Sequence, residues 1–241
     1  MRSSPSGADP LLAGTAGFAH RGLHGPNVPE NSLASVRQAI AIDAGIECDL
    51  QLSLDGFAMV FHDNDLRRLC GLDVTVDSLN AASLMGLRLA GSAEHIPWLG
   101  DLLDLVDGRV PILLELKYAR GRMDQFCQAV ASTVRRYEGP LGVMSFEASA
   151  GQWFAANAPH LRRGLVLTGR DLPWERALKI KRSRCDFVAV KVSAVSGRWL
   201  AELRRGGMSV LCWTVRTPQE RAQAAVHADA LIWEGDGRPR N

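Results

Sequence analysis

Several features of membrane, secreted and nucleic-acid-binding proteins are missing from this sequence. No run approaches the roughly 18 apolar residues of a membrane-spanning helix, and residues 1–10 lack the apolar core of a secretory signal. The formal net charge is only +2, and the longest basic run, residues 179–184, is typical of a solvated helix end. We therefore expect a cytoplasmic protein with no stable membrane insertion and no nucleic-acid partner.

Disulfide and nucleotide-binding patterns are missing as well. There are five cysteines, an odd number, and no two are spaced as C-x-x-C, which is typical of reduced thiols. No G-x-G-x-x-G or G-x-x-x-x-G-K-[ST] motif follows a predicted strand, which removes the usual nucleotide-binding reasons for an open sheet. No heptad or exposed apolar stripe indicates an oligomeric state.

What the chain does contain is a regular alternation of strand and helix patterns. Eight apolar strand segments lie around residues 18, 47, 113, 144, 166, 189, 212 and 232, with helical patterns between them. This alternation, in a chain of 241 residues, predicts a single (β/α)8 TIM barrel spanning residues 16–241. The alternative is an open, doubly wound sheet. Residues 1–15 are rich in Ser, Pro, Gly and Ala and are expected to form a flexible arm.

Two irregular features are expected to interrupt the barrel pattern. A hairpin is predicted after the second strand, because Asp55-Gly56 lies between two extended runs. A two-residue turn there would place Asp49 directly opposite His62. Residues 64–96 lack a long periodic pattern and are expected to form an insertion with one or two short helices.

Acidic residues collect where the second and third parallel strands end. Strand alternation turns Glu47 and Asp49 to one side, and Glu115 and Lys117 form a similar pair. Active sites of such barrels lie at the C-terminal ends of the strands. Three converging carboxylates need a countercharge, and all-oxygen ligands suit Mg²⁺ or Ca²⁺. The alternative is a structural salt-bridge cluster with Arg21 and Lys117.

Two histidines are expected beside these acids. His20 ends the first strand, and His62 follows the hairpin. With an ordinary pKa of about 6.5, one imidazole can accept a proton while the other donates one. Arg21 and Lys117 add positive charge that suits an anionic phosphoryl group. Together these residues indicate cleavage of a phosphodiester.

The motifs also resemble a known family along nearly the whole chain from residue 17 onward. The residues that carry the resemblance are His20-Arg21-Gly22, Pro29-Glu30-Asn31-Ser32, Glu47-Cys48-Asp49, Asp55-Gly56, His62-Asp63 with Leu66 and Arg67, Glu115-Leu116-Lys117, Ser145-Phe146 and Trp213-Thr214-Val215. In order and spacing they resemble the glycerophosphodiester phosphodiesterases. The resemblance implies a barrel shared with phosphatidylinositol phospholipases, a divalent metal, and hydrolysis of glycerophosphodiesters to sn-glycerol 3-phosphate and an alcohol.

The resemblance also implies a role for each motif residue. Metal ligands are expected at Glu47, Asp49 and Glu115. Acid–base catalysis is expected at His20 and His62, with neither role assigned to one of them. Phosphate-binding cations fall on Arg21 and Lys117. The glycerol end is expected to meet Phe146 and Trp213, unless these two are core aromatics.

The chain departs from the family pattern in four places. Where the family usually has Leu-x-Arg-Thr-Thr, this chain has Leu66-Arg67-Arg68-Leu69-Cys70, and Trp98 stands where a threonine often follows proline. The usual Trp-Thr-Val-Asn ends here in Arg216, and the usual Thr-Asp of the last strand appears as Trp233-Glu234. We expect these departures to affect the choice of alcohol rather than the metal or proton-transfer groups.

Two other functions use the same parts. A lysophospholipase D or sphingolipid phosphodiesterase would need an apolar groove, for which Leu84, Met85 and Leu87 are candidates. A barrel that binds a phosphodiester without turnover is the non-enzymatic alternative, and the intact histidine pair argues against it.

Overall fold

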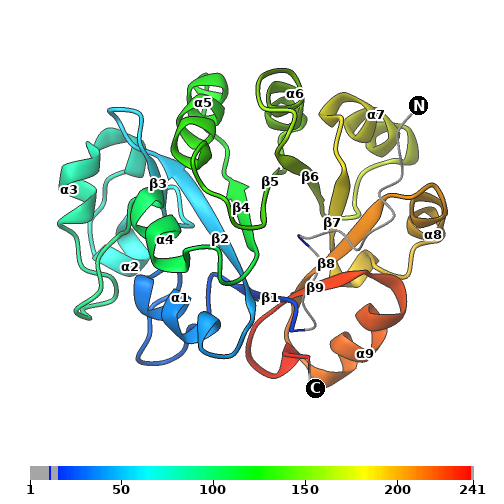
Figure 1. Cartoon of the computed structure of the whole chain (residues 1–241), viewed down its shortest axis with the longest axis horizontal. Coiled ribbons are helices and arrows are strands. Elements are labelled where there is room, and N and C mark those ends of the chain that lie inside the picture. Colours follow the sequence, from blue (N-terminus) through cyan, green and yellow to red (C-terminus); the bar gives the residue numbers. More distant parts are fainter. Residues whose placement is uncertain (1–10, 12–15, 240–241) are drawn as a thin grey trace.

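A closed ring of parallel strands forms the centre of the computed structural model, which describes Leu11 and residues 16–239 (Figure 1). Each strand is hydrogen-bonded to its neighbours, and β1 pairs with both β2 and β9, which closes the ring. The predicted TIM barrel is confirmed. Its eight parallel strands in the described residues are β1 (Phe18–His20), β2 (Gly45–Leu52), β4 (Ile112–Leu116), β5 (Leu141–Ser145), β6 (Arg162–Leu167), β7 (Phe187–Lys191), β8 (Ser209–Val215) and β9 (Ala230–Trp233).

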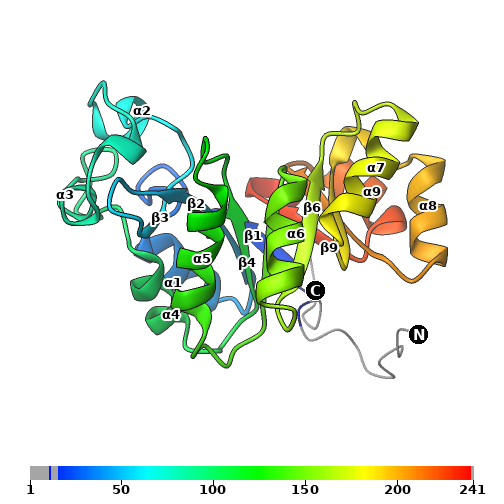
Figure 2. The same cartoon turned by 90° about the horizontal axis from the view of Figure 1, so that it is seen from above.

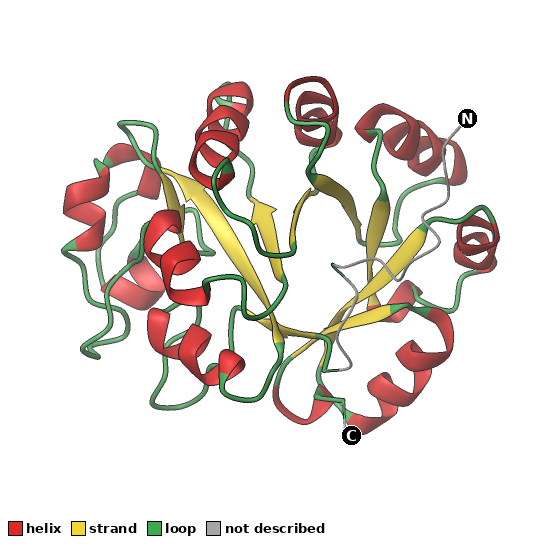
Figure 3. Cartoon of the chain, viewed as in Figure 1, coloured by secondary structure: helices red, strands yellow, loops and turns green. Residues whose placement is uncertain are grey.

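Helices surround the ring on its outside, as the red and yellow ribbons of Figure 3 show. They are α1 (Leu33–Ile40), α4 (Leu99–Val106), α5 (Met123–Val134), α6 (Ala148–Asn157), α7 (Pro173–Ser183), α8 (Arg198–Arg205) and α9 (Pro218–His227). Local capping sets where α1 begins, because the Ser32 hydroxyl accepts a hydrogen bond from the Ser35 amide at 3.1 Å. Among the described residues, no helix has both the length and the apolar content needed to cross a bilayer.

Alternate strand residues fill the barrel interior. These buried side chains are Phe18, Leu113, Met144, Val166, Phe187, Ala189, Leu211 and Ile232. Leu11 joins them with only 2% of its surface exposed. A Cβ atom at Gly142 would come within 2.7 Å of the Leu11 side chain. Gly142 lies early on β5, so Leu11 closes the end of the barrel opposite the C-terminal ends of its strands. The rest of the predicted arm, apart from the described Leu11, lies outside the described residues.

The hairpin after β2 forms, but with a different register from the predicted one. Strand β3 (Ala58–Val60) pairs antiparallel with β2, and Leu50 faces Val60. The amide of Phe61, not of His62, donates to the Asp49 carbonyl at 2.9 Å. The predicted Asp49–His62 pair is therefore wrong by one residue. The cause is a three-residue loop: the Ser53 amide donates to the Phe57 carbonyl at 2.9 Å, and Gly56 adopts φ +91°.

The insertion at residues 64–96 is an ordered layer with its own small core. It contains α2 (Arg67–Cys70), a 3-10 turn (Val76–Ser78) and α3 (Ala81–Met85). In Figures 1 and 2 its helices lie at one edge of the molecule, beyond β3. The buried side chains that hold it against the hairpin are Met59, Phe61, Leu66, Val76, Ala81, Leu84, Leu89 and Ile96. This layer positions the chain on either side of His62.

Candidate active site

Three carboxylates meet at the mouth because β2 and β4 are adjacent and in register. Asp49 lies directly beside Glu115 in the parallel ladder, and Glu47 is two residues earlier on β2. All three are buried, with exposed fractions of 1% for Glu47, 1% for Asp49 and 7% for Glu115. Each has a carboxylate oxygen within 4.8 Å of one from each of the others. Strand alternation thus brings together the acids that the sequence singled out.

Two cations contact this cluster. Lys117 Nζ lies 2.7 Å from Asp49 Oδ1 and also contacts Glu115, while Arg21 Nε lies 3.2 Å from Asp49 Oδ2. Although burial opposes ionisation, Lys117 and Arg21 hold the pKa of Asp49 well below its usual range. Burial, Asp49 and Glu115 instead raise the pKa of Glu47 well above its usual range. Salt bridges therefore form, as in the structural alternative, but among the described residues these three acids face only the two cations Lys117 and Arg21.

The cluster fits a hard divalent cation. Asn31 bonds both the side chain and the main chain of Asp49. Its Nδ2 donates to Asp49 Oδ2 at 2.9 Å, and its Oδ1 accepts from the Asp49 amide at 3.2 Å. Asp49 Oδ1 is buried and lies 2.7 Å from the Lys117 ammonium, which also contacts Glu115. An oxygen of this kind, beside two further carboxylates, suits Mg²⁺ or Ca²⁺.

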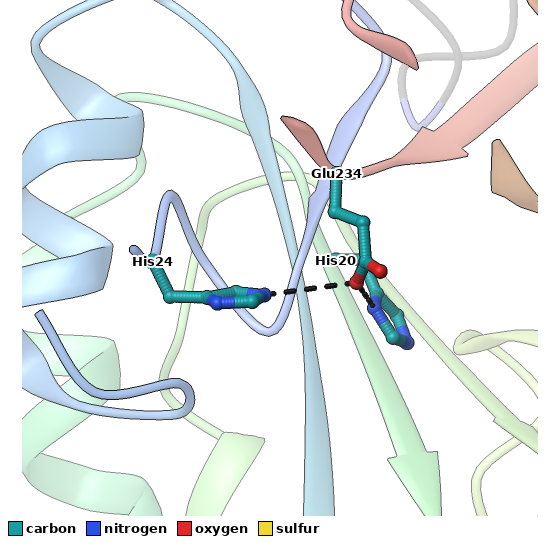
Figure 4. Close-up of side chains that lie close together, drawn as sticks. All are labelled: His20, His24 and Glu234. Carbon is teal, nitrogen blue, oxygen red and sulfur yellow. Dashed lines mark hydrogen bonds and ion pairs between the residues drawn. The ribbon is translucent and has the colours of Figure 1, made fainter. Parts of the chain in front are cut away.

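Both candidate histidines are held in the same way. His20 Nδ1 lies 2.7 Å from Glu234 Oε2 (Figure 4), and His62 Nδ1 lies 2.7 Å from Asp63 Oδ1. A carboxylate at Nδ1 favours the tautomer with the proton on that atom and leaves Nε2 as the reactive nitrogen. Burial lowers the pKa of His20 and of His62, and the carboxylates act in the opposite direction. Each ring can therefore exchange a proton through Nε2.

The carboxylates that hold the histidines are themselves held by arginines. Arg68 Nε donates to Asp63 Oδ2 at 2.6 Å, and Arg68 also donates to Glu30 at 2.7 Å. Arg21 donates to the same Glu30 at 2.7 Å. A chain of alternating charges thus runs from the phosphate-binding candidate Arg21 to Asp63, the partner of His62.

The expectation that the family departures leave the proton-transfer groups untouched is wrong. Glu234 bonds His20, and Arg216 bonds the other oxygen of Glu234. Sequence reasoning missed Glu234 as a site residue. The available signal was its place at the end of the last strand, which closes against the first strand and hence against His20.

The aromatic candidates lie together at the mouth. The Phe146 and Trp213 ring centroids are 5.6 Å apart with an interplanar angle of 89°, and Trp213 Nε1 donates to the Ala189 carbonyl at 3.1 Å. Phe146 is 38% exposed, so one of the two rings is open to a ligand. Of the three residues considered for an apolar groove, Leu84 is fully buried in the core of the insertion, whereas Met85 is 40% exposed.

Comparisons with known proteins agree with this geometry. Residues 20–234 match the model of the glycerophosphoryl diester phosphodiesterase family. A glycerophosphodiester phosphodiesterase of Caldanaerobacter subterraneus is 31% identical over 213 residues, covering 82% of this chain and 84% of that protein. The structure of an Oleispira antarctica phosphodiesterase, in complex with the product sn-glycerol-3-phosphate, superimposes with a TM-score of 0.82 at 24% identity, covering 90% of this chain and 91% of the other.

A relative with another printed activity matches a smaller part of the chain. Mouse lysophospholipase D GDPD3 is 32% identical over 133 residues, which cover 50% of this chain and 39% of that protein. The Oleispira structure, below 25% identity, supports the fold alone, whereas the family match extends from His20 to Glu234.

Proposed function

The chain belongs to the glycerophosphoryl diester phosphodiesterase family and is a phosphoric diester hydrolase, and from that premise we propose that it cleaves glycerophosphodiesters to sn-glycerol 3-phosphate and an alcohol with a divalent metal and two histidines. One observation carries this proposal: three buried carboxylates lie within 4.8 Å of one another at a mouth that also holds His20 and His62. The product bound to the Oleispira protein, sn-glycerol-3-phosphate, is the same compound as the product proposed for this chain.

The metal-binding residues in this proposal are Glu47, Asp49 and Glu115. A divalent ion held by them, Mg²⁺ or Ca²⁺, would supply positive charge that stabilises the charge developing on phosphoryl oxygens. Arg21 and Lys117 add fixed positive charge at the same place. Asn31 keeps Asp49 oriented whether or not the substrate is present, since it bonds both the side chain and the main chain of that residue.

The proton transfers are assigned to the two Nε2 atoms. One histidine takes the proton of the attacking hydroxyl or water at Nε2, and the carboxylate at its Nδ1 stabilises the imidazolium that results. The other histidine donates its Nε2 proton to the alcohol oxygen as the bond from phosphorus to that oxygen breaks. The His20–Glu234 and His62–Asp63 pairs have the same hydrogen bond, 2.7 Å from Nδ1 to a carboxylate oxygen. Either histidine can therefore be the base while the other is the acid.

The remaining candidates are proposed to position the substrate. Arg21 and Lys117 carry the charge that a phosphodiester anion requires, and both already contact carboxylates at the mouth. Phe146 and Trp213 offer an apolar surface to the carbon backbone of the glycerol. Because Phe146 is the exposed member of this pair, it is the better placed of the two to contact glycerol directly.

The reaction is tested with purified protein and a panel of glycerophosphodiesters. Glycerophosphocholine and glycerophosphoethanolamine are incubated with Mg²⁺, Ca²⁺ or Mn²⁺, and sn-glycerol 3-phosphate is measured by a coupled enzymatic assay. We expect product with at least one ion and none after chelation. The matched controls are His20→Ala, expected to lose at least about 99% of its activity, and His160→Ala, which alters an exposed histidine outside the site. Absence of product with every ion and diester would refute the proposal.

A lysophospholipid is included in the same panel to test the alternative activity. Cleavage of lysophosphatidylcholine to lysophosphatidate and choline, at a higher kcat/KM than glycerophosphocholine, would replace the proposed substrate class with the lipid one. Burial of Leu84 removes one of the three residues considered for contact with an acyl chain, and Met85 remains exposed.

A further inference from the structure

A second group of metal-ligand side chains lies on the β1 and β9 side of the mouth and is distinct from the three carboxylates. It consists of His20, His24 and Glu234, and each offers a ligand atom within 4.8 Å of the others. Figure 4 shows both imidazole rings directed at one carboxylate oxygen, Glu234 Oε2. That oxygen is 2.7 Å from His20 Nδ1 and 3.7 Å from His24 Nε2. We propose that His20, His24 and Glu234 form a site for Zn²⁺ whose occupancy switches the enzyme off.

The donor set suits a borderline-soft ion and not the ion proposed for the carboxylates. Two imidazole nitrogens and one carboxylate oxygen are a common zinc-binding set, and the fourth position is open to water. Zn–N and Zn–O bonds of about 2.1 Å in a tetrahedron place neighbouring ligand atoms about 3.4 Å apart. The two separations from Glu234 Oε2, 2.7 and 3.7 Å, lie on either side of that value, and all three ligand atoms lie within 4.8 Å of one another. Binding therefore requires an adjustment of the side chains. Mg²⁺ and Ca²⁺ prefer the all-oxygen cluster.

His24 is the residue that the proposed reaction leaves unexplained. Its Nε2 atom is buried and has no hydrogen-bond partner among the residues that the structure describes. The loop after β1 holds the residue in place, because the His24 amide donates to the Gly22 carbonyl at 3.0 Å. His24 also lines an open hollow of about 410 Å³ between this loop and the insertion, so this ligand lies next to a solvent-accessible space.

Glu234 is able to serve both histidines because its second oxygen is occupied elsewhere. Arg216 contacts Oε1, so Oε2 remains the oxygen that faces the two rings. The arginine fixes the carboxylate without covering the proposed ligand atom. Binding an ion therefore requires loss of one hydrogen bond, from His20 Nδ1 to Glu234, and this bond is replaced by two bonds to the ion.

Occupancy removes the proton-transfer capacity of His20, and in this respect the inference rests on the proposed function. When the ion takes the lone pair of Nδ1, the single proton of the neutral ring moves to Nε2. Nε2 then has no lone pair with which to accept a proton, so His20 cannot act as a base. It cannot act as an acid either, because loss of that proton would leave an anionic imidazolate. The proton displaced from Nδ1 is thus retained at Nε2 and blocks catalysis.

Zinc binding is measured first, without substrate. The protein, saturated with Mg²⁺, is titrated with Zn²⁺ against a fluorescent chelator, in the wild type, His24→Ala, His24→Gln and the exposed-histidine control His160→Ala. We expect the wild type and the control to bind one more zinc ion than either His24 variant, or to bind it at least about 10–100-fold more tightly. Equal stoichiometry and affinity in all four proteins would overturn the site. Unchanged melting temperatures in the absence of zinc establish that the variants fold.

Inhibition is measured next, with Mg²⁺ saturating and glycerophosphocholine as substrate. We expect Zn²⁺ to abolish the activity of the wild type and of His160→Ala, whereas His24→Ala and His24→Gln keep at least half of theirs at the same zinc concentration. Zinc binding without selective loss of wild-type activity would overturn the switch. A wild type that binds the additional zinc but hydrolyses no diester, even without zinc, would refute the proposed function and support the zinc site.

Discussion

Replacement of Glu47 by glutamine separates the stability of the carboxylate cluster from its proposed metal-binding role. Glu47, Asp49 and Glu115 are buried together and, within the part of the chain that the structure describes, face only the cations Lys117 and Arg21, so one negative charge lacks a partner when no ion is bound. Glutamine has nearly the same shape as glutamate and keeps an oxygen for the Arg21 amide, which donates to Glu47 Oε2 at 3.1 Å. Glu47→Gln should therefore stabilise the metal-free protein while it removes activity.

The size of the effect follows from the cost of an uncompensated buried group, about 2 kcal/mol. For a chain of this length, a change of 1 kcal/mol shifts Tm by about 2–4 °C, so the metal-free variant should melt about 4–8 °C higher than the wild type. A divalent ion at 100 times its Kd should stabilise the wild type by about 2.7 kcal/mol. The variant lacks one of three ligands and should gain much less.

The difference between the two proteins should also depend on pH. Burial raises the pKa of Glu47 above its ordinary value of 4.5. Below pH 4.5 the carboxyl is protonated in the folded and the unfolded states, and its contribution to stability is fully present. As the pH rises, the unfolded state releases the proton first, and stability is lost progressively through the folded-state pKa. The stabilising effect of Glu47→Gln should therefore be small at pH 4.5 and larger at pH 7.

The measurement is thermal unfolding of both proteins, in a chelator and in Mg²⁺ or Ca²⁺, at several pH values. A metal-free variant that melts below the wild type would refute the reasoning about uncompensated charge. Equal stabilisation of both proteins by the ion would refute the assignment of Glu47 as a ligand. Asp186, which pairs with Arg163 at 2.9 Å outside the site, provides the control substitution Asp186→Asn. It should lower Tm and leave the ion's stabilising effect intact.

Three further predictions concern the histidines and the barrel floor. His20→Ala and His62→Ala should each lower kcat by roughly 10²–10⁴-fold, and full activity in both variants would contradict their proton-transfer roles. Glu234→Gln removes the carboxylate that raises the pKa of His20, so the acidic limb of the pH profile of kcat/KM should move to lower pH, whereas a move to higher pH would count against the Nδ1 contact. Leu11→Ala should cost about 2–5 kcal/mol and lower Tm by at least about 4 °C with kcat unchanged, and an unchanged Tm would show that this residue does not close the barrel.

Turn geometry shows how a small local choice limits prediction from sequence. The Asp55-Gly56 pair correctly indicated a hairpin, but two-residue and three-residue loops share this signature. The observed loop has three residues, which places Phe61 rather than His62 opposite Asp49. The charges of Asp49 and His62 still interact, since Asp49 opposes the effect of burial on the pKa of His62. Asp49 and His62 are therefore close enough to interact electrostatically, although they are not the cross-strand pair that was predicted.

Local periodicity by itself determined the barrel and the orientation of the three acids. A parallel strand buried on both faces must be apolar, and residues two apart on a strand must face the same side, so both features are visible in short windows of sequence. The same windows located His20, Arg21 and Lys117 at strand ends.

Closure of the ring was decided only by the tertiary structure. Glu234 lies 214 residues from His20 in the chain, and the two meet because β9 pairs with β1. The same closure brings both within reach of His24, and the packing of the insertion brings Arg68 to Asp63. These contacts join residues that no local pattern relates, because their separation is set by strand order, register and loop length rather than by propensity. The sequence therefore identifies the acids and histidines, whereas the fold selects the partners that set their protonation and orientation.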